Sequence, residues 1–202
     1  MRGMLWTLTS AAVAVVLGMG VAQGGASPAS TLTPQEREGL LWMREEEKLA
    51  RDVYLTLGKL YPIPAFQNIA RSEEQHMAAV ARLLAAYGLP DPAQGKGVGE
   101  FSNPELARLY QELVAKGQAS LQAALAVGAY IEELDIQDLR VRLAQPQRPD
   151  IVAVYQNLMQ GSWNHLRAFA GNLSAVTKEP YRAQLLSQAE VDAALRRFPG
   201  RP

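Results

Sequence analysis

The chain has 202 residues, and its 20 basic residues balance 20 acidic ones, so the formal net charge is zero at pH 7. A neutral chain without a basic run does not fit a nucleic-acid-binding protein, because phosphate backbones are recognised through clustered positive charge. The chain contains no cysteine, which excludes disulfides, thiolate metal ligands and a lipid-modified cysteine. The length suits a single substantial domain with its own core.

The first 26 residues have the layout of a secretory signal peptide. Arg2 precedes a mostly apolar stretch that reaches Val21, and small residues follow up to Ala26. An uncleaved membrane anchor is the alternative, but the apolar length is barely sufficient and the flanking residues favour cleavage. We therefore predict an exported protein, periplasmic or extracellular, with no stable membrane association once residues 1–26 are removed. Residues 27–33 read as a linker.

The residues after the linker predict a pair of long helices. Thr33 and Glu36 have the spacing of a capping box, with Pro34 at the first helical position, so the first helix starts there. It should continue to about Leu60, where "YPIP" breaks it. The second helix should run from about Pro64 to the stop signal "YGLPDP".

A second pair of long helices follows after a long connection. The stretch "PDPAQGKGVGEF" predicts a flexible segment, and "NPELARLYQELVAKG" predicts a short capped helix that ends at Gly117. Long helices should then run from about Ser120 to Leu143 and from about Pro149 to Ala170. Residues 34–172 therefore predict an all-α, antiparallel four-helix bundle whose long crossover contains a short helix. The C-terminal extension, 173–202, contains one candidate short helix, "SQAEVDAAL".

Each predicted long helix carries an apolar stripe at spacings of three and four residues, and each stripe turns polar well inside its ends. The polar positions are, in chain order, Glu47, Glu73, His76, Glu132, Asp135, Ser162 and His165. In the first helix a neighbouring stripe contains Glu46, so periodicity alone does not choose between Glu46 and Glu47. His76 and His165 are the only histidines, and they occupy the same frame in the similar stretches "NIARSEEQHMAAV" and "NLMQGSWNHLRAF".

Carboxylates inside a bundle need compensation, since an uncompensated buried charge costs several kcal/mol or forces the group to protonate. Glu47, Glu73, Glu132 and Asp135 carry four negative charges when ionised. Two divalent cations would balance them, with the two imidazoles as neutral ligands. Mixed carboxylate and imidazole ligands suit iron or manganese, and zinc also fits.

Single residues of this set also have simpler interpretations. Glu47 can pair with Arg51, and Glu73 with Arg71, as solvated charges. A lone histidine is more often a hydrogen-bonded core residue than a metal ligand. Only the joint pattern of acids and histidines favours a metal site. Tyr54, about two turns beyond Glu47, suits redox chemistry or a hydrogen bond to a ligand, but core packing is the favoured interpretation.

With these residues in place, the chain resembles the ferritin-like superfamily, and rubrerythrin-type di-iron carboxylate proteins within it. "EKLARDVY" is similar to the first helix of that pattern and selects Glu47, "EEQH" supplies Glu73 and His76, and "EELD" supplies Glu132 and Asp135. The phrases "REEEKLARDVY", "EELDIQDL" and "GSWNHLRAF" look more closely like an uncharacterised family of bacterial ferritin-like proteins that are often exported.

The resemblance covers about residues 33–172 and implies an iron site, most often a di-iron one, that reacts with oxygen or peroxide. Manganese and zinc are the other candidate metals. The implied metal ligands are Glu47, Glu73, His76, Glu132, Asp135 and His165. One position departs from the pattern, because Ser162 stands where the superfamily usually has a bridging carboxylate. This change leaves a coordination position open or weakens one of the two metal positions.

Two functions are therefore expected for the bundle. The first is a di-iron oxidoreductase of the ferroxidase or peroxidase type, with metal ions and oxygen or peroxide as its partners. The second is a non-catalytic bundle in which the metal is structural or stored, and the helical surface or the 89–102 segment recognises a partner. A homodimer fits either function.

Overall fold

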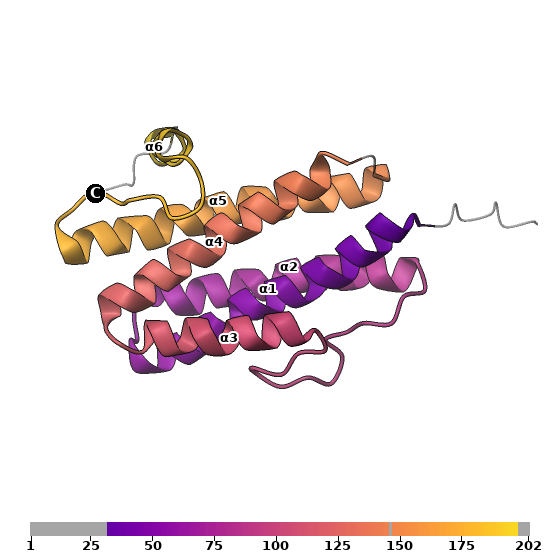
Figure 1. Ribbon diagram of the computed structural model, residues 1–202, viewed down its shortest axis with the longest axis horizontal. Coiled ribbons are helices and arrows are strands. Elements are labelled where there is room, and N and C mark those ends of the chain that lie inside the picture. The colour runs from indigo at the N-terminus through magenta and orange to yellow at the C-terminus, as the bar shows by residue number, and fades with distance from the viewer. Residues whose placement is uncertain (1–31, 146, 198–202) are drawn as a thin grey trace, which may run out of the picture. The chain divides into compact units, whose positions relative to one another are not determined.

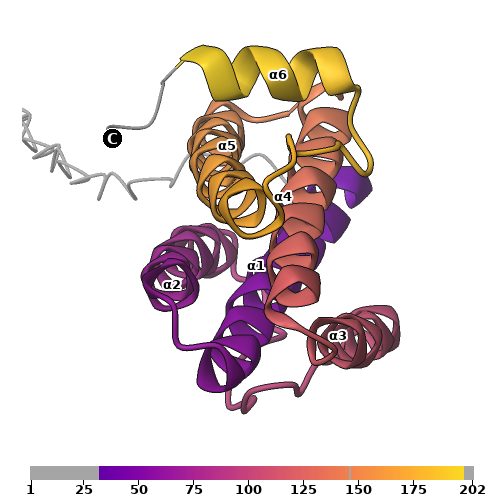
Figure 2. The same ribbon diagram turned by 90° about the vertical axis from the view of Figure 1, so that its left-hand side faces the viewer.

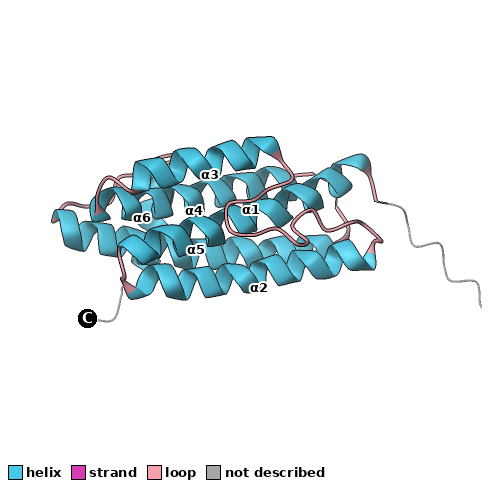
Figure 3. Ribbon diagram, turned by 90° about the horizontal axis from the view of Figure 1, so that it is seen from below, coloured by secondary structure: helices cyan, strands magenta, loops and turns pink. Residues whose placement is uncertain are grey.

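The structure is a computed structural model, and it describes residues 32–145 and 147–197. The predicted signal peptide and most of the linker lie outside the described residues. Every regular element in the described ranges is an α-helix (Figure 3). The helices are α1 (Pro34–Leu60), α2 (Pro64–Ala86), α3 (Pro104–Gly117), α4 (Leu121–Leu143), α5 (Pro149–Thr177) and α6 (Gln188–Arg197). Within those ranges, none of the helices combines the length and apolar character needed to cross a membrane.

Local capping residues set the start of most helices. The capping box of α1 is present, because Thr33 Oγ1 accepts from the Glu36 backbone N–H at 3.1 Å and the Thr33 backbone N–H donates to the Glu36 carboxylate at 2.8 Å. At α3 and α4 the side chains of Asn103 and Ser120 accept from backbone N–H groups of the first turn, without the reciprocal bond of a capping box. One predicted boundary is wrong: α5 continues past Ala170 to Thr177 and ends where the next residue has a φ of 61°.

The four long helices pack as two pairs. α1 lies along α2, α4 lies along α5, and the pairs meet through α1 with α4 and through α2 with α5 (Figures 1 and 2). The two members of each pair are joined by a short connection and run in opposite directions. α3 packs outside this group, against α1 and α4, and α6 crosses over α5.

The apolar core is divided into two clusters. One cluster gathers residues of all four long helices towards the α1–α2 connection, including Ala50, Phe66, Leu125 and Phe169. The other gathers residues towards the opposite end, including Met43, Val80, Leu139 and Leu158. In each helix the polar residues of the stripe fall between the two clusters. The sequence pattern thus produces one polar layer across the middle of the core.

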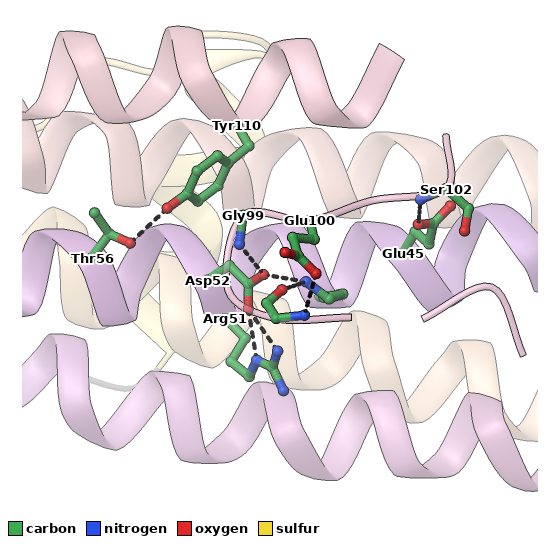
Figure 4. Close-up of polar contacts among 10 residues, drawn as sticks. Glu45, Arg51, Asp52, Thr56, Gly99, Glu100, Ser102 and Tyr110 are labelled. Carbon is green, nitrogen blue, oxygen red and sulfur yellow. Dashed lines mark hydrogen bonds and ion pairs between the residues drawn. The ribbon is translucent and has the colours of Figure 1, made fainter. Parts of the chain in front are cut away.

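The connection between α2 and α3 is tied to α1, so the prediction of a flexible segment needs correction (Figure 4). Lys48 forms a buried ion pair with Asp52 and donates to the Gly97 carbonyl at 2.7 Å. Asp52 accepts from the Gly99 backbone N–H at 2.9 Å, and Glu45 accepts from the Asn103 backbone N–H at 2.9 Å. α1 is therefore enclosed on both sides, and all residues from 43 to 50 are buried.

The segment after α5 is bound to α4 through one buried carboxylate. Glu133 accepts from the Tyr181 hydroxyl at 2.6 Å and from the backbone N–H groups of Gln184, Leu185 and Leu186 at 2.5–3.1 Å. Glu133 is fully buried. Hydrogen bonds to a buried charged group are among the stronger ones in proteins. This anchor brings α6 back onto the four long helices.

Candidate metal centre

The polar layer contains all six residues predicted as metal ligands, from four helices. Glu47 lies on α1, Glu73 and His76 on α2, Glu132 and Asp135 on α4, and His165 on α5. The pairs on α2 and α4 are three residues apart, a spacing that puts both side chains on one face of a helix. All six side chains are buried except that of His76, which is 13% exposed.

Glu73 is the residue on which the two histidines converge. Its Oε2 lies 2.8 Å from Nδ1 of His76, and its Oε1 lies 2.8 Å from Nδ1 of His165. Neither contact has the geometry of a hydrogen bond. One ligand atom from each of Glu73, His76 and His165 lies within 4.8 Å of the other two. Ligand atoms this close together, from two helices, fit the coordination of one cation.

Each histidine also contacts a second carboxylate, on a different helix. Nδ1 of His76 lies 3.1 Å from Oε2 of Glu47, and Nδ1 of His165 lies 3.4 Å from Oε2 of Glu132. The imidazole rings are 5.4 Å apart between centroids. The layer therefore has two similar halves, Glu47 with His76 and Glu132 with His165, and Glu73 belongs to both.

The buried polar atoms of this layer fit a cation. Both oxygens of Glu73, Oε1 of Glu47, Oδ1 of Asp135 and Nδ1 of His165 are buried without a hydrogen-bond partner. Buried polar groups in folded proteins are nearly always paired, so a cluster of unpaired oxygens and one nitrogen is unusual. Carboxylate oxygens and imidazole nitrogens are ligands that iron, manganese and zinc accept.

Without a cation, protons and the two histidines carry the compensating charge. Burial by itself lowers the pKa of His76, but Glu47 and Glu73 outweigh it and raise the pKa to about 11. Burial likewise opposes protonation of His165, while Glu132 and Glu73 raise its pKa to about 10. Burial also raises the pKa of Glu73, yet the two histidines outweigh it and lower that pKa to about 2.

The remaining carboxyls of the layer hold protons more readily than in water. Burial raises the pKa of Glu132 to about 6 and the pKa of Asp135 to about 7. Burial, with Asp135 as the next cause, raises the pKa of Glu47 well above its ordinary value. The layer thus contains more carboxyl groups than its two imidazoliums can neutralise. A divalent cation would compensate the negative charge of the additional carboxylates once they lose their protons.

Two further residues orient the ligands: the sequence pattern gave Ser72 no role and favoured core packing for Tyr54 over hydrogen bonding to a ligand. Ser72 Oγ lies 2.8 Å from Nε2 of His165, so Nδ1 of that ring faces the carboxylates. The Tyr54 hydroxyl donates to Oε1 of Glu132 at 2.5 Å. Burial raises the pKa of Tyr54 well above its ordinary value, so this hydroxyl keeps its proton. A partner on the outer nitrogen of a ligating histidine fixes its tautomer and ring orientation.

Asp135 and Ser162 contact each other. The Ser162 hydroxyl lies against Oδ2 of Asp135 and 3.0 Å from the Leu158 carbonyl oxygen. Ser162 therefore places a hydroxyl where the resemblance predicts a carboxylate on α5, and this hydroxyl lies next to the Asp135 carboxylate of α4. Oδ1 of Asp135 stays unpaired.

Glu46 also lies at this layer, although the resemblance had selected Glu47. It is 2% exposed, accepts from the Trp42 indole N–H at 3.0 Å and leaves Oε1 unpaired. Burial, followed by the charge of Asp135, raises the pKa of Glu46 well above its ordinary value. Glu46 and Glu47 line one narrow space together with Glu73, Glu132 and Asp135.

The solvated ion pairs considered as alternatives are wrong. Arg51 pairs with Asp52 and Arg71 contacts Asn68, while Glu47 and Glu73 are 2% and 1% exposed.

Comparison with known proteins gives consistent results. A protein family described as an uncharacterized protein domain (DUF2202) matches residues 36–197, which extends beyond residue 172, where the resemblance was expected to end. The uncharacterized protein MJ0754 of Methanocaldococcus jannaschii is 48% identical over 165 residues, 82% of this chain and 89% of that protein. The crystal structure of hypothetical protein MJ0754 from Methanococcus jannaschii is similar with a TM-score of 0.80 at 47% identity, over 84% of this chain and 96% of that chain.

Proposed function

The chain belongs to the DUF2202 family, and we propose that it is a metal-binding protein that holds divalent cations between α1, α2, α4 and α5. The observation that carries this proposal is Glu73. Its carboxylate is 1% exposed, and its two oxygens each lie 2.8 Å from a different imidazole nitrogen without a hydrogen bond. A buried carboxylate in this position needs positive charge, which protons on the two imidazoles supply without metal and which a divalent cation supplies when the imidazoles bind it as neutral ligands.

Two cation positions that share Glu73 fit the geometry best. Glu47 and His76 would complete the first position, and Glu132 and His165 the second. Oδ1 of Asp135 is free to contact the cations from α4. The charges of Glu47, Glu73, Glu132 and Asp135 balance those of two divalent cations, which removes the cost of these four isolated buried ions.

The finer proposal is a ferritin-like four-helix bundle with a di-iron carboxylate site. It is supported by the motifs "EKLARDVY", "EEQH" and "EELD", and by the contact of both histidines with one glutamate. A bound pair of iron ions would supply the two electrons needed to reduce peroxide, or to begin the reduction of oxygen. The chain holds and orients the site: Tyr54 fixes Glu132, and Ser72 fixes His165. Manganese or zinc would occupy the same ligands.

Addition of Fe(II) to the metal-free protein tests this proposal. Under anaerobic conditions we expect up to two Fe(II) to bind per chain, and we expect oxygen consumption when air is admitted. Glu73→Gln is the informative variant, because it keeps the shape of the side chain and removes the charge shared by both positions. Its binding of Fe(II) should be strongly reduced. Unchanged binding by Glu73→Gln would contradict the proposal.

A non-catalytic metal site is the second candidate, and one observation favours it. The space lined by Glu46, Glu47, Glu73, Glu132 and Asp135 has no room for a water molecule between the side chains. A structural metal suits such a closed site, because catalytic sites usually keep an open coordination position. Stoichiometric binding of Fe(II) or Zn(II) with a raised melting temperature, but without oxygen consumption, would favour this candidate.

A further inference from the structure

Gly161 on α5 makes a close approach to the imidazole of His76. A Cβ at this position would lie 2.5 Å from Cε1 of His76 and closer still to Nε2. Real Cβ atoms do not come so near to another heavy atom. A glycine inside a helix lowers stability relative to alanine, and the backbone of Gly161 does not adopt a conformation that requires glycine. The close approach is therefore the physical reason for this residue.

The two histidines are held in different ways. Nε2 of His165 has a hydrogen-bond partner in Ser72. Nε2 of His76 instead lies nearest to the position of the missing Gly161 side chain. The His76 side chain is 13% exposed and that of His165 is 8% exposed. Nε2 of His165 is thus fixed by a hydrogen bond, whereas Nε2 of His76 is enclosed by the α5 surface at Gly161.

We propose that Gly161 is a positioning residue of the metal centre: its missing side chain leaves a slot on α5 that seats the His76 imidazole. The slot holds Nδ1 of His76 beside Glu47 and Glu73, which lie at 3.1 and 2.8 Å. This inference rests on the proposed metal-binding function. The imidazole ends a rotatable side chain, so a methyl group at position 161 displaces the ring and leaves Glu73, Glu132 and His165 in place.

The test compares two alanine substitutions on the same helix. Gly161→Ala fills the slot, whereas Gly171→Ala is the matched control, because a Cβ there meets nothing within 4 Å. Zn(II) titration should show weaker binding by about 10- to 100-fold in Gly161→Ala and no change in Gly171→Ala. His76→Ala should weaken binding at least as much. The double variant Gly161→Ala/His76→Ala should be no weaker than His76→Ala alone, since both changes act through one imidazole.

A second readout does not depend on metal. The chain has two histidines, so ring NMR signals of the metal-free protein can be assigned with one variant. Gly161→Ala should shift the His76 signals and leave those of His165 nearly unchanged. If Gly161→Ala fails to fold, the double variant with His76→Ala should regain cooperative unfolding, because the clash is relieved.

The outcomes separate the inference from the proposed function. Wild-type Zn(II) affinity in Gly161→Ala with unshifted His76 signals would overturn the inference and leave the metal site intact. If the wild-type protein binds no metal, the proposed function is overturned. If Gly161→Ala still shifts the His76 signals in that case, the seating of His76 by Gly161 stands. If the double variant loses as much Zn(II) affinity as the two single variants together, the inference is also contradicted.

Discussion

At the scale of single residues, Glu73 determines the chemistry of the layer. Its carboxylate keeps its charge because His76 and His165 lie on either side, and each of these contacts another acid. The same nitrogens that would bind a cation hold protons in its absence. Metal ions and protons therefore compete for one set of atoms, and this competition makes binding depend on pH.

The direction of that dependence follows from the pKa values of the histidines. The acids beside them overcome the effect of burial and raise the pKa of His76 to about 11 and that of His165 to about 10, so both are protonated in the metal-free protein at pH 6–8. Ligation needs neutral imidazole, so binding releases protons. Affinity for Zn(II) should rise between pH 6 and pH 8, by roughly tenfold per pH unit for each proton released. Competition titrations at the two pH values measure this. Equal affinities would show that the histidines are not ligands.

Ser72 provides a milder test of the same centre. Ser72→Ala removes the partner of Nε2 of His165 and leaves every candidate ligand in place. We expect metal affinity to fall by about 10- to 100-fold. The melting temperature of the metal-free protein should change little. Gln75→Ala, at an exposed position of the same helix, serves as the control. A similar small effect in both variants would mean that His165 does not need this orientation.

At the scale of elements, local signals were sufficient where a helix terminus is set by its own residues. The capping box at Thr33, the caps at Asn103 and Ser120 and the prolines at the first turns gave helix starts that the structure confirms. The end of α5 was wrong because Gly171 is tolerated inside the helix, where it is exposed. Termination at Thr177 depends on the αL residue that follows.

Features that depend on tertiary contacts were not predictable from periodicity. Both stripes of α1 meet other long helices, since Glu47 contacts His76 of α2, whereas Trp42 donates to both Glu46 and Asp138 of α4. For this reason the spacing could not separate Glu46 from Glu47, and both lie at the polar layer. Gly161 and Ser72 gave no signal because their roles arise only when α2 meets α5.

Glu133 anchors the C-terminal segment, and its removal should release that segment. Glu133→Ala leaves the backbone N–H groups of Gln184, Leu185 and Leu186 without their acceptor. Each lost hydrogen bond to a charged group lowers the stability of the segment by about 1.5–3 kcal/mol. Limited trypsin digestion should then cleave after Arg182 much faster than in the wild-type protein. Glu179→Ala, an exposed change nearby, should digest at the wild-type rate. Equal rates in all three proteins would show that other contacts hold the segment.

At the scale of the whole molecule, the polar layer separates two apolar clusters that would otherwise form one core. Charged groups in this layer lower the stability of the fold unless a bound cation compensates their charge. A metal bound only by the native state would supply that stability. At a free metal concentration 100 times the dissociation constant, the gain is about 2.7 kcal/mol. For a chain of this size it corresponds to a rise in melting temperature of roughly 5–10 °C.

The most direct test of the metal centre measures metal content and thermal unfolding together. The protein is stripped with a chelator, loaded with Fe(II) without oxygen or with Zn(II), and compared with the double variant His76→Ala/His165→Ala. We expect one to two bound cations per wild-type chain and a higher melting temperature after loading. The double variant should neither bind the metal nor change its melting temperature. Absence of stoichiometric binding, or equal binding by the double variant, would contradict the assignment of this layer as a metal centre.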